Sequence, residues 1–132
     1  MTPVFADTLF YVALLNHRDA LHQTALDYAS QSRIPIVTTE FVLLEVANFF
    51  KQAKDRGKFG SFVQALRNDP ATTIIACDST WFQRGLDCFT ARLDKEWSLT
   101  DCISFVIMET QGLNEAVTAD HHFEQAGFKL LL

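Results

Sequence analysis

Short apolar runs alternate with amphipathic stretches along the whole chain. The apolar runs, each long enough for one buried strand, lie at 3–7, 34–39, 72–77, 115–119 and 128–132. Between them, apolar residues recur at helical spacing, as Leu21, Ala25, Tyr28 and Ala29 do. Strands that alternate with helices and are buried on both faces predict a parallel sheet covered on both sides. We therefore expect an α/β fold whose central, mostly parallel sheet has about five strands.

Capping residues and turn formers indicate where the helices begin and end. Thr38 or Thr39 is placed to cap a helix that runs to about residue 54, and a turn is expected at 55–57. The next helix ends at the Asn-Asp-Pro run of 68–70. Asp78 or Ser79 caps a further helix, and the apolar helix at 100–111 ends at Gly112.

The length and composition are typical of one globular domain that spans residues 1–132. With 132 residues, 48% hydrophobic and 20% charged, the chain can form one substantial core but not two. No apolar run approaches the roughly 18 residues of a membrane span, and the N-terminus lacks the basic segment of a secretory signal. We therefore expect a cytoplasmic protein with no membrane partner. Cys77, Cys88 and Cys102 form no C-x-x-C pair, which favours reduced, buried thiols.

Four acidic residues stand in or beside strongly apolar stretches: Asp7, Glu45, Asp101 and Asp120. A carboxylate in such surroundings needs a partner, because Asp and Glu are rarely buried unless they are paired or bind a metal. No lysine or arginine lies within five residues of any of them, and Lys95 is the nearest to Asp101. A divalent metal ion is one way to supply the missing positive charge.

The predicted fold gives these acids a common location. Ligands of a doubly covered parallel sheet gather outside the carboxyl ends of its strands. Asp7 and Asp120 follow strands closely, while Glu45 and Asp101 lie in helices that begin at the same edge of the sheet. Convergence of all four is therefore geometrically possible.

Helix capping is an alternative role for three of the four acids. Asp7 can cap a helix that begins at Thr8, and Asp120 can cap a short helix that begins at His121. Asp101 can form a capping box with Ser98. Glu45 lies too deep in its helix to be a cap, so there the functional interpretation is favoured.

Other catalytic motifs are missing from the sequence. It contains no phosphate-binding G-x-x-x-x-G-K-[ST], no dinucleotide-binding G-x-G-x-x-G and no G-x-S-x-G nucleophile elbow. Isolated histidines can support metal-free ribonuclease chemistry; they are His17, His22, His121 and His122. The pair beside Asp120 is the most informative of these.

The net charge of −5 argues at first against a nucleic-acid partner, but the basic residues cluster. Across 51–67, Asp55 is the only acid among five basic residues, Lys51, Lys54, Arg56, Lys58 and Arg67. These side chains form either a solvated helix face or a surface for phosphates.

Four motifs follow one another in order along the chain. They are D-T at the end of the first strand, T-x-E-F-x-x-x-E-V-A-N, W-S-L-T-D-C-x-S-F and T-A-D-H-H-F-E-Q-A-G-F. Together they resemble the PIN-domain family, and most closely its VapC-like ribonucleases of toxin–antitoxin pairs. The resemblance spans nearly all of 3–132, and the last two motifs are the specific ones.

The resemblance implies a compact three-layer α/β/α sandwich and an endoribonuclease that depends on Mg²⁺ or Mn²⁺. Matched by motif, Asp7, Glu45 and Asp101 are its metal-binding, catalytic acids, and Asp120 is the fourth, more variable one. Thr8 and Thr100 match the hydroxyl positions that support the site in the family. Many members have a second acid two positions after the fourth, where this chain has His122. That departure bears on a second metal site, and a nitrogen donor there favours Mn²⁺ relative to Mg²⁺.

We therefore expect hydrolysis of an RNA phosphodiester by a metal-activated water, leaving 5′-phosphate and 3′-hydroxyl ends. The resemblance also implies the toxin of a type II toxin–antitoxin pair, with a cognate antitoxin and a homodimer. Candidates for holding RNA phosphates without base specificity are Lys51, Lys54, Arg56, Lys58 and Lys95.

Two alternatives stay open at this point. One is a housekeeping nuclease on structured RNA. The other is a PIN-like interaction module with a vestigial site. The second depends on Phe49, Phe50, Phe59 and Phe62, which either belong to the core or line a groove for a dimer or an antitoxin.

Overall fold

Five parallel strands form one sheet in the order β3-β2-β1-β4-β5. The computed structural model describes residues 1–31 and 34–132. Its strands are β1 (Val4–Ala6), β2 (Ile36–Thr39), β3 (Thr72–Ile75), β4 (Glu115–Val117) and β5 (Lys129–Leu130). The first strand is central because the chain adds β2 and β3 on one side of it and β4 and β5 on the other.

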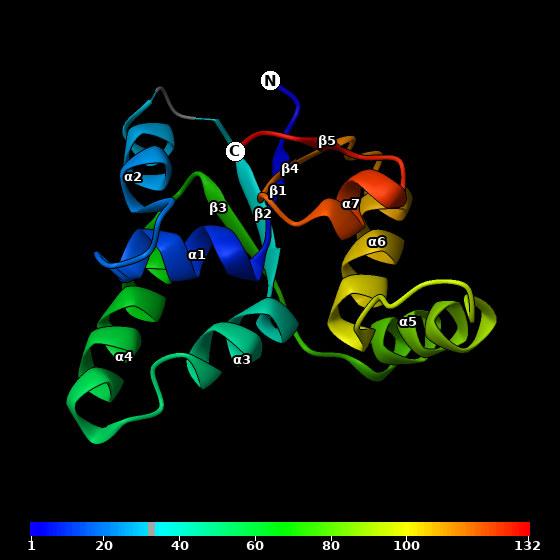
Figure 1. Cartoon of the computed structure of the whole chain (residues 1–132), viewed down its shortest axis with the longest axis horizontal. Coiled ribbons are helices and arrows are strands. Elements are labelled where there is room, and N and C mark those ends of the chain that lie inside the picture. The colour runs from blue at the N-terminus through cyan, green and yellow to red at the C-terminus, as the bar shows by residue number, and fades with distance from the viewer. Residues whose placement is uncertain (32–33) are drawn as a thin grey trace.

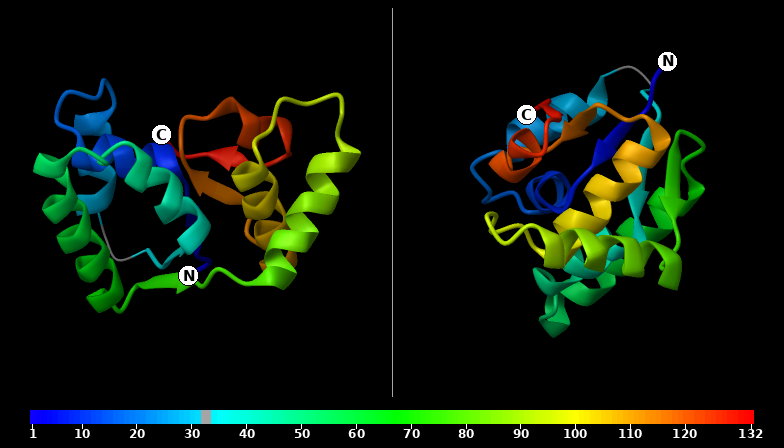
Figure 2. Two further views of the ribbon diagram at one scale, coloured as in Figure 1. Left: turned by 90° about the horizontal axis from the view of Figure 1, so that it is seen from below. Right: turned by 90° about the vertical axis from the view of Figure 1, so that its right-hand side faces the viewer.

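Helices cover both faces of this sheet. Those of the described residues are α1 (Thr8–Leu15), α2 (His22–Ser30), α3 (Glu40–Asn48), α4 (Ala53–Asn68), α5 (Ser79–Ala91), α6 (Leu99–Gln111) and α7 (His121–Gln125). Figures 1 and 2 show α1, α2 and α4 on one side of the strands and α5, α6 and α7 on the other. In Figure 1, α3 lies below, at the end where β2 finishes. The predicted three-layer α/β/α sandwich is confirmed.

Aromatic pairs pack within both helical layers, and one of them joins a helix to the sheet. On one side, Tyr11 of α1 packs edge-on against Phe62 of α4, with ring centroids 5.2 Å apart. On the other, Phe105 of α6 meets Phe123 of α7 at 4.9 Å, and Phe123 stacks on Phe5 of β1 at 6.2 Å. Such pairs add to the free energy of burial itself. They fix α1 against α4 and α6 against α7, and α7 against the central strand.

The prediction that one helix runs to about residue 54 is wrong at the helix end. The structure ends α3 at Asn48 and starts α4 at Ala53, so the predicted turn at 55–57 lies inside a helix. We attribute the break to a tertiary contact, because Phe50, in the connection between the two helices, is buried in the core. The Nε of Arg56 donates to the Lys51 carbonyl at 2.7 Å across this connection. Gly57 costs the new helix about 1 kcal/mol relative to alanine, which the packing of the later turns offsets.

The cysteine prediction is right only in part. Cys102 is buried, Cys88 is half-buried and Cys77 is exposed, and all three are unpaired. Cys77 is exposed because it follows β3, which is an edge strand of the sheet. Among the helices of the described residues, none combines the length and the apolar character needed to cross a membrane.

Candidate functional site

The four acids meet where the strand order of the sheet reverses. From β1 the chain continues to one side of the sheet, and from the neighbouring β4 it continues to the other. Open α/β sheets bind ligands at such a switch point. A cavity of about 320 Å³ lies there, which we call the acidic cavity. It is lined by Asp7, Thr8, Leu9, Glu45, Phe49, Glu96, Ser98, Asp101, Asp120 and His122.

Asp7 is buried at the start of α1, with an exposed fraction of 3%. It occupies the N-cap position, but its side chain makes no capping hydrogen bond. Its Oδ2 instead accepts from the hydroxyl of Thr118 at 3.0 Å. Burial raises the pKa of Asp7 to about 7, and the charges of Asp101 and Asp120 act in the same direction. The capping alternative therefore fails for Asp7.

Thr118 is a site residue that was not predicted from the sequence. Its hydroxyl is fully buried, donates to Asp7 and accepts from the backbone N–H of Asp120 at 3.0 Å. One side chain thus ties together the acids that follow β1 and β4. A hydroxyl at the carboxyl end of a predicted strand, two residues before Asp120, was the signal available for finding it.

Glu45 reaches the acidic cavity from α3 and is held there by Thr8. The Thr8 hydroxyl donates to Glu45 Oε1 at 2.6 Å, across 37 residues of sequence. The predicted supporting hydroxyl at Thr8 therefore lies in contact with one of the acids. Thr100, the other predicted hydroxyl, lines a neighbouring cavity with Glu45 and not the acidic cavity itself.

Asp101 and Asp120 do cap helices, yet both also line the acidic cavity. Asp101 completes a capping box with Ser98, and Asp120 accepts from the His122 N–H at 2.9 Å. A carboxylate has enough acceptor sites for a cap and a further ligand. Burial raises the pKa of Asp101, the charge of Asp120 adds to this, and contacts with Ser98 and His122 oppose it. Capping and a functional role are thus compatible at these positions.

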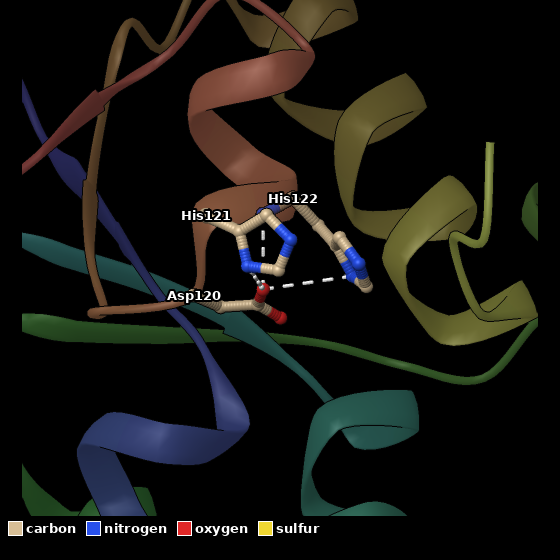
Figure 3. A group of neighbouring side chains, drawn as sticks. All are labelled: Asp120, His121 and His122. Carbon is tan, nitrogen blue, oxygen red and sulfur yellow. Dashed lines mark hydrogen bonds and ion pairs between the residues drawn. The ribbon is translucent and has the colours of Figure 1, made fainter.

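His122 lies between two of the acids. Its Nδ1 is 3.1 Å from Asp101 Oδ2. Figure 3 shows its contact with Asp120, where His122 Nδ1 is 3.5 Å and His121 Nδ1 is 3.8 Å from Asp120 Oδ1. Among the described residues, one group of three side chains has potential metal-ligand atoms within 4.8 Å of one another, namely Asp120, His121 and His122. No three of the four acids meet this limit. Of the histidines outside this pair, His22 bonds the Ala13 carbonyl and His17 lines a different cavity.

The donor set of the acidic cavity fits a hard divalent cation. Its lining has five carboxylates, one histidine and no lysine or arginine; the carboxylates are Asp7, Glu45, Glu96, Asp101 and Asp120. Within the described part of the chain, no lysine or arginine nitrogen comes within 4.0 Å of any of these five. Carboxylate oxygens suit Mg²⁺ and Mn²⁺. Glu96, in the loop before α6, was not predicted.

The predicted phosphate-binding residues lie outside the acidic cavity. Lys54 and Lys58, on α4, line a second cavity that shares Phe49 with it. Lys51 and Arg56 are exposed beside them. Lys95 lies in the loop after α5, where its Nζ is 4.0 Å from Asp94 Oδ2.

The four phenylalanines around the basic segment divide between core and surface. Phe50 is buried, and Phe59 and Phe62 pack against the core. Phe49 is exposed. Three of the four thus have the core role, and the groove that the interaction-module alternative requires is not formed by the set as a whole.

We expect the stability of the metal-free protein to fall as the pH rises from about 4 to 7. Asp7 goes from a pKa of 3.8 in the unfolded chain to about 7 when folded, so the folded state holds its proton more tightly across this range. Stability then decreases with rising pH, by up to about 4 kcal/mol for a shift of this size. Urea unfolding of the wild type and Asp7→Asn in EDTA, from pH 4 to 8, measures it. In Asp7→Asn, the free energy of unfolding should lack this decrease with rising pH. Identical dependence of the unfolding free energy on pH in the two proteins would contradict the raised pKa of Asp7.

Comparisons with known proteins agree with the predicted family, although no family model matches the chain. The 23S rRNA-specific endonuclease VapC20 of Mycobacterium tuberculosis is 25% identical over 125 residues, which cover 95% of each chain. The crystal structure of VapC20 from this organism, described as a Sarcin-Ricin loop cleaving toxin, matches with a TM-score of 0.82 and 26% identity over 95% of both chains.

Two more distant structures share the fold. VapBC2 from Rickettsia felis, bound to a DNA fragment from its promoter, matches with a TM-score of 0.69 at 14% identity and covers 98% of both chains. FitAcB from Neisseria gonorrhoeae matches with a TM-score of 0.65 at 13% identity and covers 98% of this chain and 96% of its own. In its motifs, its sheet topology and its sequence along nearly the whole chain, this protein is similar to VapC20 and resembles the VapC-like proteins of the PIN-domain family.

Proposed function

We propose that the protein is a metal-dependent endoribonuclease that hydrolyses RNA phosphodiester bonds, and that it is the toxin of a type II toxin–antitoxin pair. The observation that carries the proposal is the acidic cavity, where five carboxylates converge at the switch point of the sheet without a lysine or arginine among them. RNA as the substrate is supported by the relative described as a 23S rRNA-specific endonuclease.

In this proposal, Asp7, Glu45 and Asp101 hold a Mg²⁺ or Mn²⁺ ion. When bound, the ion lowers the pKa of a coordinated water and neutralises charge on the phosphate. The Thr8 hydroxyl fixes the orientation of Glu45, and the Thr118 hydroxyl fixes that of Asp7. These contacts restrict the orientations of Glu45 and Asp7, and the three carboxylates draw closer together when the ion binds, because no three of the four acids have oxygens within 4.8 Å of one another among the described residues.

Asp120 is the proposed fourth acid, and it orients the attacking water. Its position is set by its capping bond to the His122 N–H and by the bond from its own N–H to Thr118. His122 lies between Asp101 and Asp120, where its imidazole reduces their repulsion when it is protonated. Water as the nucleophile does not require the 2′-hydroxyl of the substrate, so the products carry 5′-phosphate and 3′-hydroxyl ends.

The proposal includes protein partners, namely an antitoxin and a second copy of this chain. An antitoxin is supported by the description of the VapC20 structure as that of a toxin. Large apolar side chains on α3 and α5 are available for such contacts, with Leu44 exposed at 63% and Phe82 at 45%.

The test is cleavage of a panel of structured and single-stranded RNAs with Mg²⁺, Mn²⁺ or EDTA, with Asp7→Asn as the control. We expect metal-dependent cleavage by the wild type and none by the variant. Cleavage that resists EDTA would point to the histidines instead. No cleavage by the folded wild type would favour the interaction module. A second measurement follows bacterial growth while the protein is expressed without an antitoxin, and unchanged growth would favour a housekeeping nuclease.

A further inference from the structure

A second cavity, which we call the basic cavity, opens beside the acidic one. It has about 280 Å³ and lies between the end of α1, the loop that follows and the start of α4. Arg18, Lys54 and Lys58 give it three positive charges, and Asp55 is its one carboxylate. Its remaining lining residues are Val12, Leu15, Asn16, His17, Phe49 and Phe50. A lining of this charge suits an anion.

Hydrogen bonds to backbone shape the basic cavity without neutralising it. The Nζ of Lys58 donates to the Leu15 carbonyl at the end of α1, and Asn16 Oδ1 accepts from the Arg18 N–H at 3.1 Å. Throughout 1–31 and 34–132, no carboxylate oxygen lies within 4.0 Å of the side-chain nitrogens of Arg18 or Lys54. Both charges therefore remain available to a ligand.

Phe49 forms the boundary between the two cavities, since it lines both. It follows Glu45 by four residues at the end of α3, so both side chains project from one side of the helix. The Phe49 side chain is 56% exposed, whereas that of Phe50 is 7% exposed and anchors the chain in the core. Exposed aromatic rings beside cationic grooves are the platforms on which single-stranded RNA stacks its bases.

We propose that the basic cavity is a second RNA subsite, which binds a backbone phosphate next to the cleaved one while the base between them stacks on Phe49. The inference rests on the proposed function, because the cleaved phosphate is assigned to the acidic cavity. Stacking and phosphate contacts tolerate any sequence, so this subsite positions the strand rather than selects it. It adds Arg18 and Phe49 to the predicted RNA contacts and leaves Lys51, Arg56 and Lys95 outside the cavity.

The test measures binding apart from cleavage. A labelled single-stranded RNA of about 10 nucleotides, within the range that such surfaces span, is titrated in EDTA at several salt concentrations by fluorescence anisotropy. All variants are made in an Asp7→Asn background. Phe49→Ala and Phe49→Leu remove the ring, Phe49→Trp keeps an aromatic face, and Arg18→Gln/Lys54→Gln removes the two free charges. Leu44→Ala on α3 and Arg67→Gln on α4 are matched controls outside both cavities.

We expect Phe49→Ala and Phe49→Leu to weaken binding on the order of 10-fold and Phe49→Trp to retain it. The double variant should reduce the slope of log affinity against log salt by about 1.4, for two phosphate-neutralising charges. The controls should change neither quantity. Circular dichroism melting identifies any variant that fails to fold, and the three Phe49 substitutions keep the test interpretable if one does.

Unchanged affinity and salt slope in these variants, or equal losses in the controls, would overturn the subsite. Binding of a poly-glutamate peptide that depends on Arg18 and Lys54 as strongly as RNA binding does would assign the cavity to an acidic protein segment, which also overturns it. Cleavage by the wild type separates the two proposals. Metal-dependent cleavage with unaffected binding in the variants rejects only the subsite, whereas no cleavage by the wild type rejects the proposed function.

Discussion

Asp101→Asn should reduce RNA cleavage by on the order of 10³-fold or more, the range for loss of one catalytic group, without destabilising the metal-free protein. The amide oxygen can still accept from the Ser98 N–H, so the capping box at the start of α6 can persist. The substitution also removes the buried negative charge of Asp101, whose pKa is raised by burial and by the nearby charge of Asp120. The melting temperature in EDTA should therefore stay the same or rise.

Asp78→Asn is the matched control for this substitution. Asp78 caps α5 by accepting from the N–H groups of Thr80 and Trp81, and it lies outside the acidic cavity. The same chemical change there should leave cleavage intact. If Asp101→Asn retained cleavage and lost stability, Asp101 would have a capping role alone.

Millimolar Mn²⁺ should raise the melting temperature of the wild type by on the order of 10 °C. A ligand at 100 times its Kd stabilises the folded state by about 2.7 kcal/mol, and each kcal/mol shifts the melting temperature of a domain of this size by about 4 °C. Since burial raises the pKa of Asp7 to about 7 and the ion binds the ionised carboxylate, the shift should be larger at pH 8 than at pH 5.5.

Differential scanning fluorimetry of the wild type and Asp7→Asn, with Mn²⁺, Mg²⁺ and EDTA, measures this shift. The variant should lose most of it, because it lacks one of the proposed ligands. An equal shift in both proteins would place the bound ion elsewhere, for example on the exposed His121 with Asp120.

The sheet and the helix starts were predictable because their signals are local. The buried runs that became β1 and β2 are bounded by Asp7 and by the capping Thr39, and Asp78 caps α5 as predicted. The boundary between α3 and α4 was missed because it depends on the burial of Phe50, a contact made across the fold. No glycine or proline in 48–52 marks the turn, while Gly57, which resembles a turn former, lies inside α4.

The site was only partly predictable for the same reason. Asp7 and Asp120 could be placed from the ends of their strands, but the pairing of Thr8 with Glu45 spans 37 residues and no local pattern reports it. The family resemblance supplied the grouping of the four acids but not this contact. Capping and function are alternatives when only the sequence is considered, whereas in the structure Asp101 forms a capping box and lines the acidic cavity as well. Thr118 was missed because its partners become neighbours only when β1 and β4 pair.

Analysis of the product ends tests the central claim most directly. A labelled RNA is incubated with the wild type in Mn²⁺ or EDTA, and the fragments are identified by mass spectrometry. We predict 5′-phosphate and 3′-hydroxyl ends in Mn²⁺ and intact RNA in EDTA. Fragments with 5′-hydroxyl and 2′,3′-cyclic phosphate ends, formed equally in EDTA, would contradict hydrolysis at the acidic cavity, because they require the substrate's own 2′-hydroxyl as the nucleophile.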